Sequence, residues 1–215
     1  MFFFELKDRV AVVLGGRDDT ASVSAAVCRL LAERGARIAA VGPDESQLAD
    51  LVDELRWGGT EALGIVAEGT DAAAMEAVRA SVLTELGAPD LLFVLPCPDR
   101  AAGWQHTVDS GLTTVFQALQ AFVPAMAETG AGAVVTLAPR GPDPATNAVG
   151  GGVTALTQHY ARLVADFGVR ANVVSWTPCE STVDDAAFAA LYLASDAAAT
   201  MTATTLDVAG TLMRL

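Results

Sequence analysis

The sequence predicts an α/β fold, a doubly wound parallel sheet of about seven strands with helices on both faces. Short unbroken apolar runs alternate along the chain with longer segments in which apolar residues recur at helical spacing. Strands of a parallel sheet are buried on both faces, so they read as continuous apolar runs. Regular alternation of such strands with helices favours parallel βαβ units.

Seven segments carry the strand pattern. The first, VAVVL, ends at a glycine pair, and the second, RIAAV, is closed by Gly42 and Pro43. The run LLFVL is the most apolar and is expected at the centre of the sheet. The expected strands are residues 10–14, 37–41, 61–65, 91–95, 133–137, 170–174 and 205–208.

Six segments carry the helix pattern, and several of them end at glycine or proline. The second shows its apolar face most clearly, through Leu48, Leu51, Val52 and Leu55. The Gly-Gly-Gly run at 150–152 would cost about 1 kcal/mol per glycine inside a helix, so the fifth helix is expected to begin after it. The expected helices are residues 21–34, 45–56, 72–86, 103–129, 153–167 and 182–193.

Composition limits the number of domains and the kinds of partner. A chain of 215 residues, 52% of them hydrophobic, fits a single domain over residues 1–215. A net charge of −13 repels nucleic acid and anionic lipid, so neither partner is expected. The N-terminal apolar stretch stops at Glu5, too early for a signal peptide, and we expect a cytoplasmic protein. Cys28, Cys97 and Cys179 are far apart and form no metal-binding pair, so no metal site is expected.

Four stretches carry a resemblance to a known family. They are LKDRV before the first strand, LAERGAR at 31–37, GVRAN at 168–172, and the segment 191–210, LYLASDAAATMTATTLDVAG. In these stretches, and in the order and spacing of its elements, the chain resembles the classical short-chain dehydrogenase/reductases over roughly residues 6–210. The resemblance implies a Rossmann-type fold and, in ordinary members, NAD(P)-dependent oxidoreductase activity.

The cofactor positions of that family are altered here. Its glycine-rich turn holds the cofactor pyrophosphate at a helix N-terminus. This chain keeps Gly15 and Gly16, but the turn is about three residues longer and places Asp18 and Asp19 where the pyrophosphate would lie. Like charges repel there, and Arg17 offsets only part of that repulsion. The structural alternative is a turn followed by a helix capped by Asp19, Thr20 or Ser22.

The other cofactor positions are also changed. The residue after the second strand, which holds the adenine ribose in the family, falls on Gly42 and Pro43. A short family motif after the third strand is partly retained as Glu68-Gly-Thr-Asp71. An N-cap at Thr70 or Asp71 is enough to explain these residues. We therefore expect no cofactor, neither NAD nor NADP.

The catalytic positions of the family are changed together. Its asparagine falls on Gly111, its serine on Ala138 or Pro139, its tyrosine on Thr146 and its lysine on Gly150. In such enzymes the lysine lowers the tyrosine pKa so that a phenolate can act near neutral pH. The only lysine here is Lys7, so no Tyr-x-x-x-Lys pair exists. The expected catalytic set is therefore empty.

Other polar residues near the family's active site offer weaker alternatives. His106 begins the long fourth helix, and Cys97 follows the fourth strand; either is a possible ligand contact. Thr146 and Asn147 are possible hydrogen-bonding partners, whereas His159 is read as a surface or interface residue. The segment after Pro178 is too short to form the family's substrate lid.

These observations lead to one main hypothesis and two alternatives. The main hypothesis is a non-catalytic structural or regulatory protein that assembles with itself or with an active relative. The alternatives are an enzyme with altered chemistry on the same scaffold, and a small-ligand sensor that uses the cofactor cleft. Assembly is expected through the long helices at 103–129 and 153–167, as in relatives, because the first of them carries a broad apolar face. That face consists of Leu112, Val115, Phe116, Leu119, Phe122 and Val123.

Overall fold

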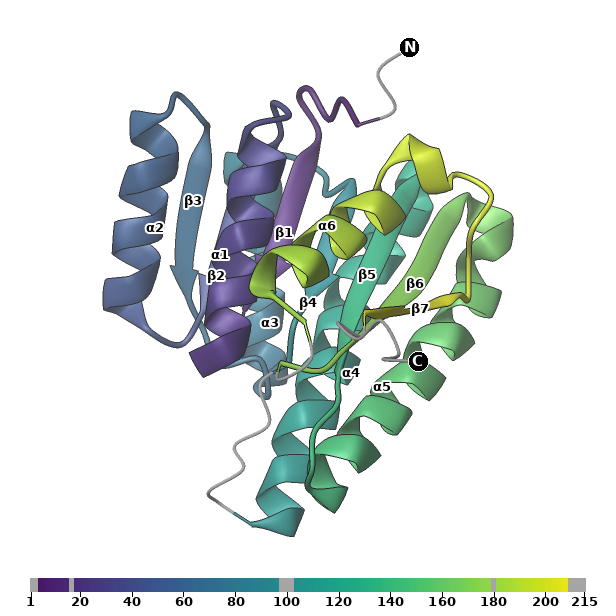
Figure 1. The fold of residues 1–215 in the computed structure, drawn as a ribbon. Helices are drawn as coiled ribbons and strands as arrows, with labels where there is room; N and C mark the ends of the chain where they lie inside the picture. Colours follow the sequence, from purple (N-terminus) through teal and green to yellow (C-terminus); the bar gives the residue numbers. More distant parts are fainter. Residues whose placement is uncertain (1–3, 16–17, 97–102, 179–180, 209–215) are drawn as a thin grey trace, which may run out of the picture.

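A computed structural model describes residues 4–15, 18–96, 103–178 and 181–208, without the side chains of residues 18–21. Its strands form one parallel seven-stranded sheet in the order β3-β2-β1-β4-β5-β6-β7 (Figure 1). This confirms the predicted fold class. The strands are β1 (Val10–Leu14), β2 (Arg37–Gly42), β3 (Ala62–Val66), β4 (Leu91–Val94), β5 (Gly132–Pro139), β6 (Val169–Trp176) and β7 (Thr205–Val208).

Helices cover both faces of the sheet (Figure 1). The core on one face gathers buried side chains of α1, α2 and α6, and the core on the other face gathers those of α3, α4 and α5. Both faces of the central strands are therefore buried, which explains their unbroken apolar sequences. The helices are α1 (Asp18–Ala32), α2 (Glu45–Trp57), α3 (Ala72–Glu85), α4 (Trp104–Thr129), α5 (Pro144–Val164) and α6 (Val183–Ala194).

Two helix starts differ from the expectations. Helix α1 begins at Asp18, so the three proposed caps, Asp19, Thr20 and Ser22, lie within the helix. Helix α5 begins at Pro144 rather than at residue 153. Its N-cap is Asp143, whose carboxylate accepts the Thr146 amide at 2.7 Å, and proline at the first position suits a helix start.

Packing explains why the glycine run lies inside α5. A Cβ on Gly150 would overlap the carbonyl oxygen of Pro139, and a Cβ on Gly152 would lie 2.5 Å from Leu112 Cδ2 of α4. Glycine lets α5 approach both β5 and α4. Contacts with the rest of the fold therefore offset the low helix propensity of these residues.

The apolar face of α4 is mostly buried in the hydrophobic core. Four of its six residues, Val115, Leu119, Phe122 and Val123, are buried against the sheet. Leu112 is half-buried, and Phe116 keeps 40% of its surface exposed. Packing within one chain therefore covers most of this face, so its breadth alone does not require assembly.

The strand order reverses direction between β1 and β4. Strands β2 and β3 follow on one side of β1, and β4 to β7 follow on its other side, so this is the switch point of the sheet. The two strands pair in parallel, and the Leu95 amide donates to the Leu14 carbonyl at 2.9 Å, just past their ends. Open α/β sheets bind ligands outside the carboxyl ends of their strands at such a point. No helix within the described ranges is long and apolar enough to cross a membrane.

Candidate functional site

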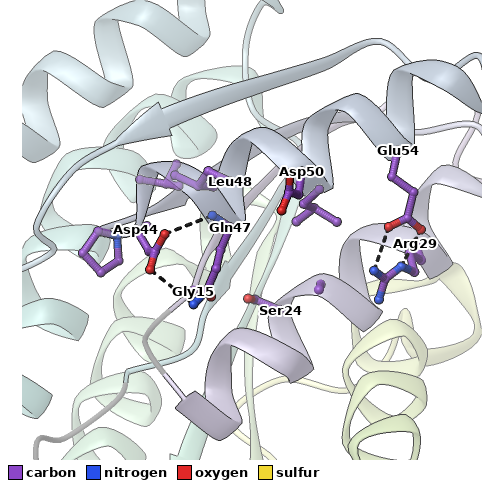
Figure 2. Close-up of a pocket in the computed structure, with 13 residues that line it drawn as sticks. Gly15, Ser24, Arg29, Asp44, Gln47, Leu48, Asp50 and Glu54 are labelled. Atoms are coloured by element: carbon purple, nitrogen blue, oxygen red, sulfur yellow. Dashed lines mark hydrogen bonds and ion pairs between the residues drawn. The ribbon is translucent and has the colours of Figure 1, made fainter.

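A cleft of about 250 Å³ opens where β1 and β2 end, between helices α1 and α2 (Figure 2). It lies at the carboxyl edge of the sheet, on the β2 side of the switch point. Its wall is partly apolar, and charged or amide side chains from both helices reach it. The lining residues are Gly15, Ser24, Ala25, Arg29, Val41, Gly42, Pro43, Asp44, Gln47, Leu48, Asp50, Leu51 and Glu54.

Gly15 and Ser24 set the contact between β1 and α1 at this cleft. A Cβ on Gly15 would overlap Ser24 Oγ, so glycine is what allows α1 to pack this closely against the end of β1. The Gly15 amide donates to the Val41 carbonyl at 2.9 Å, which extends the pairing of β1 with β2 by one residue. These contacts give the cleft a fixed base at the strand ends.

Asp44 lies at the junction of β2 and α2. As the N-cap of α2, its carboxylate accepts the Gln47 amide at 3.0 Å, and it also accepts Gln47 Nε2 at 3.3 Å (Figure 2). A carboxylate has about four lone-pair positions, so capping leaves acceptor capacity on the exposed side chain of Asp44. Asp44 can therefore accept hydrogen bonds from a hydroxyl-bearing ligand.

Arg29 and Glu54 join α1 to α2 along the cleft. Arg29 Nε donates to Glu54 Oε1 at 2.7 Å, and Nη2 donates to Oε2 at 2.7 Å, the paired geometry of a strong Arg–carboxylate interaction. The hydrogen bond from Arg29 lowers the pKa of Glu54, and the same bond raises the pKa of Arg29. Both groups therefore stay charged, and each neutralises the other.

The six residues at the family's cofactor positions do not all line the cleft. Gly15 and Gly42 line the cleft, as the resemblance implies. Asp18 and Asp19 form the start of α1, with side chains outside the described part of the structure, as is the whole of Gly16. Glu68 is exposed in the loop between β3 and α3 and is not among the lining residues. Asp71 is the N-cap of α3, as predicted, and accepts the Ala73 amide at 2.8 Å.

Three of the family's catalytic positions lie at tight contacts of a helix with a strand or with another helix. Gly150 packs on the Pro139 carbonyl, so the positions of the family lysine and serine touch each other here. Gly111 is buried on α4, where a Cβ would lie 2.6 Å from Val149 Cγ1 of α5. A side chain at either glycine would push α5 away.

Thr146, at the position of the family tyrosine, is fully buried near the start of α5. Its hydroxyl has no partner within the described structure, and the same is true of Ser175 Oγ and Trp176 Nε1 near the end of β6. Asn147, by contrast, donates to the Gly141 and Asp143 carbonyls at 2.7 and 3.0 Å and fixes the loop before α5. Thr146 therefore has an unpaired hydroxyl, whereas both amide hydrogens of Asn147 are engaged.

The two histidines lie on the two long helices. His106 is exposed in the first turn of α4, and His159 is exposed on α5 with its ring edge-on to Tyr160. The first turns of α4 and α5 extend past the carboxyl ends of the strands (Figure 1). His106 is not among the residues that line the cleft. Cys97 falls outside the described residues.

Sequence reasoning missed Ser24, Arg29, Asp44 and Glu54 as site residues. Only Asp44 had a local signal, because an aspartate directly before a helical segment and after a strand is a typical N-cap. Arg29 and Glu54 belong to different helices and come together only through folding. Of the described residues, no group of three or more His, Cys, Asp or Glu side chains is placed to hold a metal ion.

Comparison with known proteins gives consistent matches. The family model for short chain dehydrogenase matches residues 9–191. An acetoacetyl-CoA reductase from Synechocystis sp. is 32% identical over 192 residues, which cover 81% of this chain and 73% of the reductase. A short-chain dehydrogenase/reductase from Burkholderia xenovorans is 25% identical, with a TM-score of 0.84 over 95% of this chain and 96% of that structure. A gluconate 5-dehydrogenase from Burkholderia cenocepacia, solved with NADP and tartrate, is 23% identical, with a TM-score of 0.83 over 99% and 98%.

These matches contradict two expectations. The hypothesis of a non-catalytic protein is wrong as a reading of the sequence, because the relatives are named as reductases and dehydrogenases and no finding shows that activity is lost. The expectation that neither NAD nor NADP is a cofactor is contradicted by the same family and by a structural neighbour that holds NADP. The chain belongs to the short-chain dehydrogenase family.

Proposed function

We propose that the protein is an oxidoreductase that uses a nicotinamide dinucleotide and transfers protons with residues other than a tyrosine–lysine pair. The cleft at the ends of β1 and β2 carries the proposal, because it is a partly apolar hollow with hydrogen-bonding groups at the edge where this fold binds ligands. The names of the relatives support the same class of reaction, the interconversion of an alcohol and a carbonyl compound.

The residues of the cleft fit the adenosine half of such a cofactor. Val41, Pro43 and Leu48 offer apolar surface for a base, and the Asp44 carboxylate has acceptor capacity for ribose hydroxyls. The volume of about 250 Å³ is below that of a site for a whole drug-sized ligand, so it suits one part of a larger molecule. When bound, the nicotinamide supplies hydride transfer.

The protein's own part is to bind, orient and exchange a proton. Thr146, at the family's tyrosine position, is fully buried and lies outside the cleft lining, so we give it no contact with the substrate. His106, exposed in the first turn of α4, is our candidate for proton transfer, because imidazole can both accept and donate a proton. Lys7 has no part in this scheme, since it lies against Gly35 at the opposite edge of the sheet.

Calorimetry with NAD and NADP tests the binding step. Asp44→Ala should weaken binding of the preferred dinucleotide by about tenfold, which corresponds to about 1.4 kcal/mol. Asp71→Ala is the matched control, because it also removes an N-cap aspartate but lies outside the cleft lining. Absence of binding by the unmodified protein would refute the proposal.

Turnover tests the chemical step. Purified protein, NAD or NADP, and a panel of small secondary alcohols and ketones should give a change in absorbance at the wavelength of the reduced nicotinamide, above a heat-inactivated control. Dinucleotide binding without turnover on any member of the panel would instead favour a ligand sensor that uses the same cleft.

Assembly and location are further parts of the proposal. We place the protein in the cytoplasm on the basis of its acidic composition and its buried, unpaired Cys28. We propose that it pairs with itself or with a related subunit through α4 and α5. Phe116 on α4, Leu163 on α5 and Phe167 just beyond it support this, because each leaves 40% or more of its surface exposed.

A further inference from the structure

Strand β3 lies at one edge of the sheet, and among the described strands it pairs with β2 alone (Figure 1). Proteins usually protect such an edge with charged side chains, proline or a bulge, because its unpaired backbone groups can pair with another strand. The opposite edge strand, β7, carries Asp207. The sequence of β3, ALGIV, contains no charged residue and no proline, so this edge has no such protection.

The hydrogen bonds with β2 fix which backbone groups of β3 point out of the sheet. The Glu61 carbonyl accepts the Ile38 amide at 2.9 Å, and the Ala67 amide donates to the Gly42 carbonyl at 3.0 Å. In a parallel ladder, alternate residues turn both backbone groups toward the same neighbour. Every second residue from Glu61 to Ala67 therefore faces β2, and the residues between them face away from the sheet.

Three residues of β3, namely Ala62, Gly64 and Val66, turn their backbone groups outward. The Ala62 carbonyl accepts Arg56 Nε at 2.9 Å, so the protein itself covers the start of the edge. The amides and carbonyls of Gly64 and Val66 make no hydrogen bond with any other residue in the described part of the chain. Both residues are exposed, Val66 to 53%. Each of them thus offers a donor and an acceptor to an added strand.

The surroundings of this edge indicate the chemistry of its partner. Leu63 and Ile65 are only half-buried on the α3 side of the strand, so apolar surface lies beside the open backbone groups. Glu68 and Asp71 follow the strand and are exposed. The whole chain carries a net charge of −13, which attracts a basic segment at long range and repels a second copy of the same chain.

We propose that β3 is a docking strand: an extended segment of a partner protein, apolar at its centre and with lysine or arginine at its ends, pairs with Gly64 and Val66. In such strand addition, main-chain hydrogen bonds supply affinity and the side chains supply specificity. The apolar centre covers Leu63 and Ile65, and a basic end lies beside Glu68. The inference is independent of the proposed oxidoreductase activity, since these residues lie outside the lining of the cleft.

A short peptide of this chemistry tests the inference. The probe is the fluorescein-labelled, end-blocked peptide KKVTVTVKK, and its anisotropy should rise saturably when the protein is added. Amide hydrogen exchange measured by NMR should slow by about tenfold or more at Gly64 and Val66 once the peptide is bound. The amides of Leu63 and Ile65, which face β2, should exchange slowly with and without it. The peptide EEVTVTVEE, with acidic ends, should not bind.

Matched variants separate backbone pairing from general effects. Val66→Pro removes an outward amide but no hydrogen bond to β2, so the sheet should tolerate it and peptide binding should weaken by about tenfold. Val66→Ala keeps the amide and should weaken binding by less than about threefold. Glu68→Gln should weaken binding by about threefold, whereas Asp184→Asn, at an exposed position of α6, should leave it unchanged. Circular dichroism melting curves verify that each variant is folded.

The remaining outcomes would overturn the inference. Equal binding by Val66→Pro and Val66→Ala, or exchange at Gly64 and Val66 that the peptide does not slow, would show that the edge is not the docking site. Failure of KKVTVTVKK to bind, or equal binding of the acidic peptide, would refute the stated chemistry of the partner. A dimer that Val66→Pro splits and Val66→Ala does not would assign the edge to a second copy of this chain instead.

Discussion

Gly150 of α5 lies directly against Pro139 at the end of β5, so close that a Cβ on residue 150 would overlap the Pro139 carbonyl oxygen. The backbone of the helix thus rests on the backbone of the strand. This contact explains why a glycine run is found inside a helix of 21 residues. It also means that a long side chain at position 150 requires α5 to move.

The first prediction compares neighbouring glycines of α5. Gly150→Ala should destabilise the protein by about 1–3 kcal/mol, because its Cβ would overlap backbone. Gly151→Ala should stabilise it by up to about 1 kcal/mol, because no heavy atom beyond its chain neighbours and its own helical backbone lies within 4 Å of that Cβ, and alanine is the better helix former. Urea unfolding measures both. Similar values for the two variants would contradict the described contact.

The same contact bears on reconstruction of the family's catalytic pair. Thr146→Tyr with Gly150→Lys should lower stability by at least as much as Gly150→Ala, and it should not raise turnover. The buried position of Thr146 adds to the cost, since a tyrosine there exceeds the available space. A stable double variant with increased turnover would show that α5 can shift without penalty.

A second prediction uses the two histidines. His106→Gln should lower kcat by about 10²–10⁴-fold if His106 transfers the proton, because loss of a general acid–base has effects of that size. His159→Gln should leave kcat unchanged, because His159 lies toward the C-terminal end of α5 and contacts Tyr160 rather than the cleft. Steady-state kinetics on the same substrate distinguishes them. Equal activity of the two variants would remove His106 from the proposed chemistry.

The strands were predictable from the sequence because their burial leaves a local signature. A parallel strand covered on both faces is largely apolar, as VAVVL and LLFVL are, whereas the edge strands β3 and β7 are partly exposed and carried a weaker signal. The start of α5 was not predictable in this way. Its glycines read locally as a helix break, whereas contacts with Pro139 and Leu112, both distant in sequence, make them necessary.

The residues of the candidate site likewise differ in whether a local sequence signal could predict them. Gly15 follows β1 directly and Gly42 is the last residue of β2, so a resemblance in sequence was enough to place them at the cleft. Arg29 and Glu54 are separated by 25 positions and lie on helices that pack side by side, so only the fold brings them together. The substituted motif positions alone also predicted a non-catalytic protein, and that prediction was wrong because residues outside a motif can line a site.

A third prediction concerns Arg170, which is half-buried beneath the end of α6. Its guanidinium donates to four backbone carbonyls, those of Leu193, Ala194, Ser195 and Met201, at 2.8–3.3 Å. Burial lowers the pKa of Arg170 from its ordinary value. Arg170→Met should cost about 2–4 kcal/mol, because these carbonyls lose a charged donor. Arg162→Met, at an exposed position of α5, should cost less than about 0.5 kcal/mol in the same chemical denaturation experiment.

A fourth prediction concerns Cys28. Burial raises the pKa of this thiol from 9.0 to about 12, so at pH 8 it stays protonated and unreactive in the folded protein. In a Cys97→Ser/Cys179→Ser background, a thiol reagent at pH 8 should label no cysteine until urea unfolds the chain. Rapid labelling without denaturant would show that α1 opens readily or that the thiol is not enclosed.

The last prediction concerns assembly. Phe116 is 40% exposed on α4, so Phe116→Asp should leave the fold intact and reduce the mass measured by light scattering at tens of micromolar. A stable pair needs about 1,200–2,000 Å² of buried surface, and a charge placed at its centre would be desolvated without a partner. Trp57→Asp is the matched control, because Trp57 is 95% exposed at the end of α2, on the other face of the sheet. A monomeric unmodified protein, with no relative co-purifying from its source cell, would refute assembly through α4 and α5.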